Sequence, residues 1–155
     1  MTAASQLADE YDSAMAQVIE VAESCSDADW KLPCPNEERT VGVVFDHIAE
    51  GNPVVVGWVN EFLAGRPLAL TPEVLNTHNA EHAERAANRP RAETVQDLKT
   101  SSEATSRAIR ALTEAQLHQR QEFGWAGQQE VGWVAKVALR HPRGHLKNIR
   151  EALGR

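Results

Sequence analysis

Cysteine is scarce in this sequence, and its scarcity limits the ways in which the chain can be held together. Only Cys25 and Cys34 are present, at a spacing that fits no zinc-finger pattern. In a reducing cytosol such a pair stays reduced, so we expect free thiols and no disulfide. A chain of 155 residues can bury roughly two thirds of its unfolded surface. We therefore expect a hydrophobic core to hold the fold, and any metal ion to serve function more than folding.

Long apolar runs and clusters of basic residues are also missing. No run approaches the ~20 residues that a membrane-spanning helix needs. The first residues, MTAASQLADEYDSA, are acidic, whereas a signal peptide begins basic and then becomes apolar. Sixteen Lys and Arg against 22 Asp and Glu give a formal charge of −6, and no basic stripe is available to neutralise a phosphate backbone. We expect a soluble, cytoplasmic protein without a nucleic-acid or membrane partner.

Helical periodicity is the main pattern that the sequence does contain. Apolar side chains at positions 7, 11, 14, 18, 21 and 25 alternate steps of four and three, which predicts a first helix ending near Ser26. Prolines, Asp and Asn over 26–39 then favour a loop. Thr40 is a suitable N-cap for a second helix over 40–65, in which Pro53 should bend the helix or split it into two pieces.

The start of the third helix carries the clearest signals in the chain. Thr71-Pro72-Glu73 combines an N-cap side chain, a proline at the first helical position and an early acid facing the helix dipole. The helix that follows, over 73–89, is polar on most sides. We expect it to cover the bundle or to line a cleft.

Two further helices complete the pattern. An apolar stripe runs over 95–112, with Thr94 and Asp97 spaced as a capping box. The last helix is predicted over 130–153, and its inward positions are 131, 134, 138, 141, 145 and 149. No useful strand-period alternation and no internal repeat is visible. The sequence therefore predicts a single all-α domain over 1–155, an up-and-down four-helix bundle, with apolar stripes that leave room for a homodimer.

Two histidines stand on the apolar stripe of the last helix. His141 and His145 are four residues apart, which places them on one face with about 6 Å between Cβ atoms. At that separation both rings can reach one ion at about 2.0–2.1 Å. A single inward histidine is more often an ordinary core residue, but a pair at this spacing favours a metal site. His47, beside Ile48 on the second helix, is the third inward histidine that such a site needs.

Three neutral imidazoles with one position left open are typical of a catalytic metal site. Imidazole ligands suit zinc, nickel, iron or copper, and of these we expect zinc or nickel. His78 and His82 form a rival pair with the same spacing, but acidic neighbours on a polar helix favour a solvated or cleft-lining position for both. His118 should be exposed.

Other polar residues near these histidines have simpler interpretations. Asp46 and Glu50 flank His47 and could orient the ligands, although solvated surface acids are the simpler interpretation. Cys34 could be a nucleophile, but no neighbouring cation or helix N-terminus lowers its pKa, so we interpret it as a loop thiol.

Several segments together resemble the DinB-like superfamily. WKLPCPNEERTVGVVFDHIAEG is similar to the start of the second helix in these proteins, and RHPRGHLKNIREAL is similar to their last helix. The stretch NTHNAEHAE resembles their Asn- and Ala-rich third helix more weakly. The chain departs from the family pattern at Arg39, where a Trp often precedes the Thr-Val pair.

The resemblance implies a four-helix bundle that holds a divalent metal ion through His47, His141 and His145. Relatives include thiol-dependent S-transferases and isomerases, among them mycothiol-dependent maleylpyruvate isomerase, whose extra C-terminal domain this chain lacks. By this resemblance we expect an enzyme that uses the ion and a low-molecular-weight thiol on a small electrophilic molecule, with Asn79 and His82 as candidate cofactor-binding residues. The alternatives are a metal-dependent small-molecule hydrolase and a metal-binding or stress-response protein without catalysis.

Overall fold

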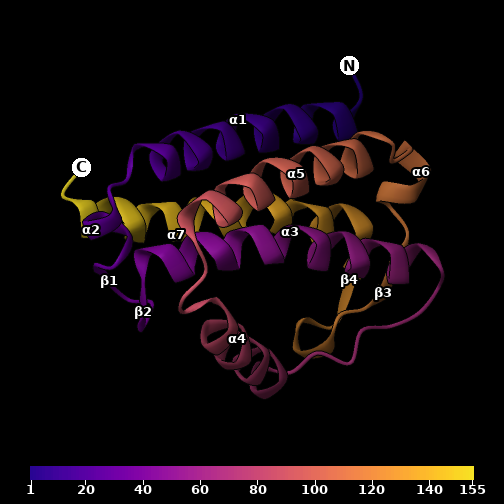
Figure 1. Cartoon of the computed structure of the whole chain (residues 1–155). Helices are drawn as coiled ribbons and strands as arrows, with labels where there is room; N and C mark the ends of the chain where they lie inside the picture. The colour runs from indigo at the N-terminus through magenta and orange to yellow at the C-terminus, as the bar shows by residue number, and fades with distance from the viewer.

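The structure, a computed structural model, describes residues 1–155 and consists mainly of helices (Figure 1). Four long helices form a bundle, and a fifth, α4, lies outside it against α3. In chain order the elements are α1 (Ala3–Ser24), α2 (Asp27–Trp30), β1 (Pro33–Cys34), β2 (Arg39–Thr40), α3 (Val41–Leu63), α4 (Pro72–Ala86), α5 (Arg91–Arg110), α6 (Glu114–Leu117), β3 (Arg120–Glu122), the 3-10 turn η1 (Gly124–Ala126), β4 (Gln128–Glu130) and α7 (Val131–Leu153).

The bundle is built from α1, α3, α5 and α7. Helix α1 packs against α5 and α7, and helix α3 packs against the same two helices. The four helices therefore form a square in which α1 and α3 occupy opposite corners. Apolar side chains that recur at helical spacing fill its centre, including Tyr11, Phe45, Leu98 and Ile149. The all-α helical bundle predicted from the sequence is confirmed. None of its helices combines the length and the apolar composition needed to cross a membrane.

The directions of the helices follow from the course of α4. Hydrogen bonds join Asp46 to Thr94 and Asn52 to Ser101, so residue numbers rise together along α3 and α5 and these two helices are parallel. Between them α4 carries the chain back along the outside of the bundle (Figure 1). The helices therefore do not simply alternate in direction along the chain, because the return path lies outside the four-helix core.

Two predicted helix starts agree with the structure. The hydroxyl of Thr40 accepts a hydrogen bond from the backbone N–H of Val43, and that of Thr71 accepts one from Val74. Pro53 does not split its helix, since α3 runs without interruption from Val41 to Leu63.

The predicted start of the fourth long helix is wrong. α5 begins at Arg91, after Pro90, and Thr94 is inside it. The side chain of Thr94 turns inward to donate a hydrogen bond to Asp46, and Asp97 accepts one from Arg89. Because both side chains are used in tertiary contacts, the pair that has the spacing of a capping box does not act as one.

Two small antiparallel hairpins were not predicted. β1 pairs with β2 ahead of α3, and β3 pairs with β4 ahead of α7. Strands of two or three residues are too short to show a period-2 pattern in the sequence. Each hairpin leads directly into a helix that carries a histidine of the predicted metal site, so it anchors the first turn of that helix.

Candidate metal centre

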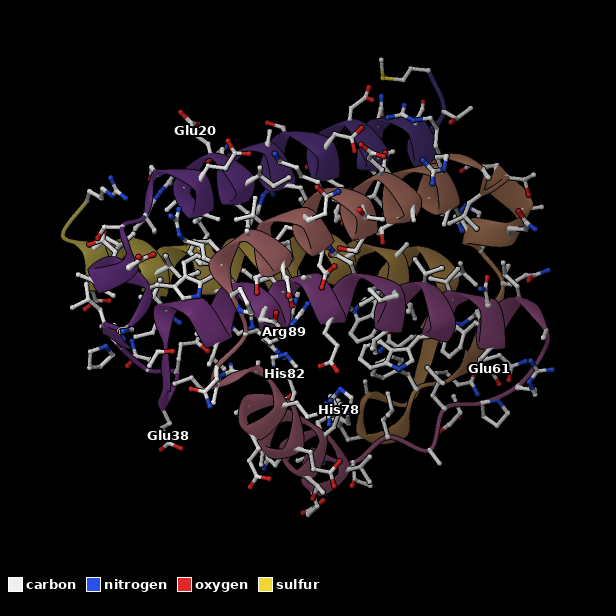
Figure 2. The ribbon with its side chains drawn as sticks, in the orientation of Figure 1. Glu20, Glu38, Glu61, His78, His82 and Arg89 are labelled. Carbon is white, nitrogen blue, oxygen red and sulfur yellow. The ribbon has the colours of Figure 1, made fainter.

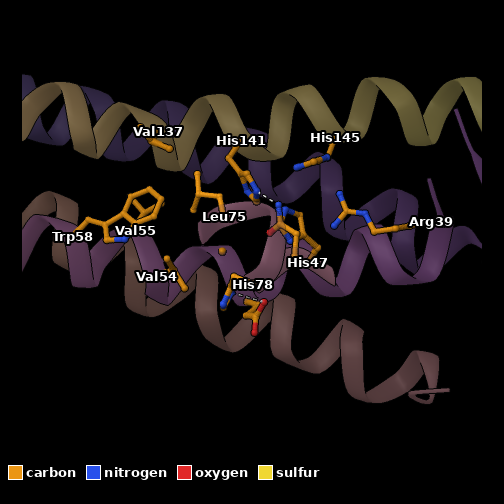
Figure 3. A pocket seen from close by; sticks show the side chains of 13 residues that line it. Arg39, His47, Val54, Val55, Trp58, Leu75, His78, Val137, His141 and His145 are labelled. Atoms are coloured by element: carbon orange, nitrogen blue, oxygen red, sulfur yellow. Dashed lines mark hydrogen bonds and ion pairs between the residues drawn. The ribbon is translucent and has the colours of Figure 1, made fainter. Parts of the chain in front are cut away.

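The structure brings His47, His141 and His145 together between α3 and α7 (Figure 3). Nε2 of His141 lies 2.9 Å from Nε2 of His47. Ring centroids are 4.7 Å apart for His47 and His141, 4.9 Å for His47 and His145, and 4.5 Å for His141 and His145. One nitrogen from each ring lies within 4.8 Å of the others. Three imidazoles from two antiparallel helices thus converge on one point, as a shared ion requires.

The helices position these rings through ordinary packing. His47 is buried among apolar neighbours on α3, and Ile48 beside it is fully buried. On α7 the two histidines continue a stripe whose other members, such as Val134 and Ile149, are buried, and the helix continues through Pro142. His47 is buried, and His141 and His145 are part-buried at the edge of the stripe, so helix packing alone places the three rings.

Gly51 makes the room that the ring of His141 occupies. A Cβ atom at position 51 would lie 2.6 Å from Cε1 and 3.0 Å from Nδ1 of His141. Both distances are shorter than ordinary van der Waals contact. A glycine one turn after His47 therefore lets α7 place His141 against the backbone of α3.

Burial keeps the central rings neutral. Desolvation lowers the pKa of His47 far below its usual value, and the neighbouring His141 and Arg39 lower it further. Desolvation also lowers the pKa of His141, to about 3, helped by His145 and Arg39. At neutral pH both rings are uncharged, which is the form that binds a metal ion.

Glu37 fixes the orientation of His145. Nδ1 of His145 donates to Oε1 of Glu37 at 2.6 Å, and Nδ2 of Asn148 donates to the same oxygen at 2.7 Å. Burial alone would raise the pKa of Glu37, but these bonds, together with one from Arg39, hold it at about 2. The carboxylate is ionised and can only accept, so Nδ1 of His145 donates to it and Nε2 is the nitrogen that remains for an ion.

Sequence reasoning missed Glu37. It lies in the turn between β1 and β2, flanked by Asn36 at φ 65° and Glu38 at φ 54°. A carboxylate in a polar turn is usually solvated, and its spacing from the histidines carries no helical signal. Only the hairpin geometry aims it at α7.

A second group of ligand atoms shares His47. Atoms of His47, Glu50 and His82 also lie within 4.8 Å of one another, so this group too could hold a metal ion. Two of its members are already engaged, however. Glu50 accepts a hydrogen bond from Arg85 at 2.9 Å, and Nε2 of His82 lies 2.8 Å from Oδ1 of Asp46. The three-histidine group has fewer competing contacts, because its nitrogens face one another.

The prediction of Asp46 as a solvated surface acid is wrong, whereas His82 lines a cleft, which is one of the two positions expected for it. His82 of α4, labelled in Figure 2, is 3% exposed, Asp46 of α3 is 5% exposed, and the two bond to each other. Oδ2 of Asp46 also accepts from Thr94 and Arg89, both at 2.7 Å. Burial would raise the pKa of Asp46, but these partners hold it below its usual value. His78 is half-exposed beside Glu50, and His118 is exposed, as predicted.

A cavity of about 220 Å³ opens beside the three histidines. The three imidazoles line it from α3 and α7, and Leu75, His78 and Asn79 line it from α4. Asn79 thus lines the cavity as a candidate cofactor residue would, whereas His82 does not line it and instead faces a neighbouring cavity with Asp46. The other walls come from Arg39, Glu50, Val54, Trp58 and Val137.

The two cysteines lie outside this cavity. Both are free and buried, and neither lines the walls. Desolvation, followed by the nearby charge of Glu37, raises the pKa of the Cys34 thiol to about 11. Burial also raises the pKa of Cys25. Neither thiol is ionised at neutral pH, so the chain supplies no cysteine nucleophile.

Comparison with known families gives one clear match. A sequence model of the DinB superfamily matches residues 2–149, which is nearly the whole chain. A comparison with curated proteins found no significant match.

Proposed function

Because the chain belongs to the DinB superfamily, we propose that it is a divalent-metal-dependent enzyme in which His47, His141 and His145 hold the ion. The reaction we propose is a thiol-dependent S-transfer or isomerisation of a small electrophilic molecule. The observation that carries this proposal is the convergence of three imidazoles on one side of a cavity large enough for a small ligand.

The donor set fits a catalytic ion better than a structural one. Three protein nitrogens leave a coordination position for a ligand, whereas a structural site closes with a fourth protein group. Neutral imidazoles suit zinc or nickel. When bound, the ion would supply Lewis acidity and lower the pKa of a thiol or water that reaches it.

The residues of the chain would perform the remaining tasks. Glu37 holds His145 in the tautomer that offers Nε2. Leu75 and Trp58 line the cavity with apolar surface and limit the entry of water. Asn79 has an amide that can hydrogen-bond a polar group of the ligand.

The sulfur in such a reaction has to come from a second molecule. Cys25 and Cys34 are buried outside the cavity, and both have raised pKa values. A low-molecular-weight thiol that enters the cavity is therefore required, and mycothiol is one candidate.

Elemental analysis of tag-free protein tests the metal site. We expect roughly one ion per chain in the wild type and a large loss in His47→Ala and in His141→Ala. The matched control is His118→Ala, which removes an exposed histidine and should leave the metal content unchanged. Full retention in both site variants would refute the proposal.

Turnover then tests the chemistry. Activated esters and other electrophiles are offered to the metal-loaded protein with and without a thiol, and we expect turnover only when both thiol and metal are present.

A hydrolase is the second candidate function. The carboxylate of Glu50 lines the cavity and is 28% exposed, so it could serve as a base for water. Turnover that is independent of thiol would favour the hydrolase.

A further inference from the structure

We propose that Arg39 binds a carboxylate group of the ligand that occupies the three-histidine cavity, so that this protein acts on a carboxylate-bearing thiol or electrophile. The inference rests on the proposed function, and it adds a class of ligand to it.

Arg39 is placed beside the histidines by the first hairpin. It is the last residue before the N-cap Thr40, and its side chain is only 12% exposed. Figure 3 shows it next to His47 and His145 at the edge of the cavity. The same side chain also lines a second cavity of about 630 Å³, together with Asn76 and Asn79 of α4. Arg39 therefore lines both cavities.

The guanidinium has donors that the protein does not use. Nη2 donates to Oε2 of Glu37 at 2.6 Å, but Nη1 is buried and has no hydrogen-bond partner. A buried donor without an acceptor is unfavourable, because it has lost its water and gained nothing in return. A carboxylate bound beside Arg39 would supply the acceptor that Nη1 lacks, once a small rotation of the guanidinium uncovers this nitrogen.

The charges around the cavity favour an anion. Glu37 accepts hydrogen bonds from Arg39, His145 and Asn148. Its single negative charge therefore neutralises at most the positive charge of Arg39. Glu50, the other acid on the wall, is paired with Arg85. The lowered pKa values of His47 and His141 keep these two rings neutral, so a divalent ion would leave the cavity with excess positive charge. A planar carboxylate matches the fork of a guanidinium, because two parallel N–H···O bonds can form.

Calorimetric titration of the metal-loaded protein tests this inference with three probes. The first two are 3-mercaptopropionate and 3-mercaptopropan-1-ol, which are matched thiols with and without a carboxylate. The third is succinate, added to protein saturated with the mercapto-alcohol. A preference for the mercapto-acid places the carboxylate on the thiol, whereas binding of succinate beside the alcohol places it on the electrophile.

We expect the wild type to prefer the acid over the alcohol by about tenfold or more, or to bind succinate beside the alcohol. Arg39→Gln should reduce the preference to about twofold and abolish succinate binding. The matched control is Arg66→Gln, which changes an exposed arginine paired with Glu61, and it should behave as the wild type.

Several outcomes would overturn the inference. They are equal binding of acid and alcohol by the wild type with no binding of succinate, or an unchanged preference in Arg39→Gln. Arg39→Gln could lose its metal because Glu37 is released. In that case Arg39→Lys is used instead, since lysine keeps the charge near Glu37 but lacks the fork of the guanidinium. An unreduced preference for the acid in Arg39→Lys also overturns the inference.

Failure of the proposed function gives a different result. A protein that holds no metal, or that binds neither thiol while holding metal, refutes the thiol chemistry. Succinate added alone would still decide whether Arg39 is an anion site.

Discussion

Glu37 orients His145 from a turn that lies 108 residues earlier in the chain. The carboxylate also holds Asn148 and Arg39. Its pKa of about 2 lies below the ordinary 4.5. The stability that this pair contributes is therefore present above about pH 4.5 and is lost as the pH falls through about 2. At neutral pH the carboxylate stays ionised and keeps accepting the hydrogen bond from Nδ1 of His145.

We predict that Glu37→Gln weakens metal binding by about 10- to 100-fold, because an outer carboxylate that fixes a histidine ligand has an effect of that size. Competition with a chromophoric chelator measures the dissociation constant. Glu38→Gln is the matched control, since the neighbouring side chain is exposed (Figure 2). Equal affinities for the two variants would show that Glu37 has no role in orienting the ligand.

Gly51 offers a second test that leaves every ligand in place. We predict that Gly51→Ala lowers the metal content strongly, because the new methyl group would lie 2.6 Å from the ring of His141 and force it to move. Gly57→Ala on the same helix is the control, since nothing lies within 4 Å of its added carbon. That change should stabilise the helix by roughly 0.5–1 kcal/mol.

Elemental analysis and thermal unfolding of both glycine variants check these expectations. A Gly51→Ala protein with full metal content would show that the ring of His141 is free to shift without loss of the site.

Single residues show where sequence reasoning reaches its limit. His47, His141 and His145 were found because helical periodicity shows which side chains point inward. Asp46 was misjudged, since its neighbours along the chain do not reveal that His82, Thr94 and Arg89 converge on it. In the sequence, Arg39 was identified only as a position that departs from the family pattern. Partners that come from other helices leave no periodic signal.

α4 is attached to the bundle mainly through polar contacts. Its only buried residues are His82 and Ala86, so little apolar area holds it in place. Asp46 on α3 bonds to His82 on α4 and to Arg89 just beyond it. This ion-paired cluster therefore sets the distance between α4 and α3, and with it the width of the cavity.

We predict that Asp46→Ala loosens α4 while the bundle stays folded. Removing the acceptor leaves buried donors unpaired, and breaking a buried pair in this way typically costs about 3 kcal/mol. Hydrogen exchange should accelerate in α4 more than in α1, α3, α5 or α7. Asp12→Ala, which removes an exposed acid paired with Arg110, is the control. Uniform acceleration in all helices would contradict a local role for Asp46.

Helices were easier to predict than their connections. The starts at Thr40 and Thr71 were found because capping is a local interaction. The start of α5 was misplaced because Thr94 and Asp97 bind partners on other elements. The hairpins were missed because strands of two or three residues have no period to detect.

The molecule as a whole has a core that does not depend on the metal site. Thirty buried residues form one continuous hydrophobic cluster, and the histidines lie at its edge beside the cavity. The length of the chain also predicted a core that is stable without an ion, since a domain of this length needs no metal ion to fold. The directions of the four helices were not accessible from the sequence, because apolar stripes do not tell whether a polar helix lies inside or outside the bundle.

We predict that removal of the metal with a chelator leaves the helical circular dichroism unchanged. Re-addition of zinc or nickel should raise the unfolding temperature in a concentration-dependent way, because a ligand that binds the folded state stabilises it by mass action. His47→Ala, heated under the same conditions, should show no such rise. Loss of helicity on chelation would mean that the ion holds the fold together.

The distance along the chain between the two halves of the site also bears on how the protein is made. His47 and His141 are separated by 94 residues, so the loop that they close can form only after α7 has left the ribosome. A nascent chain that has released α1 and α3 therefore has one imidazole in place and no means of capturing an ion tightly. If the proposed site holds an ion, its loading would belong to the last stage of maturation, after the fourth helix of the bundle has docked.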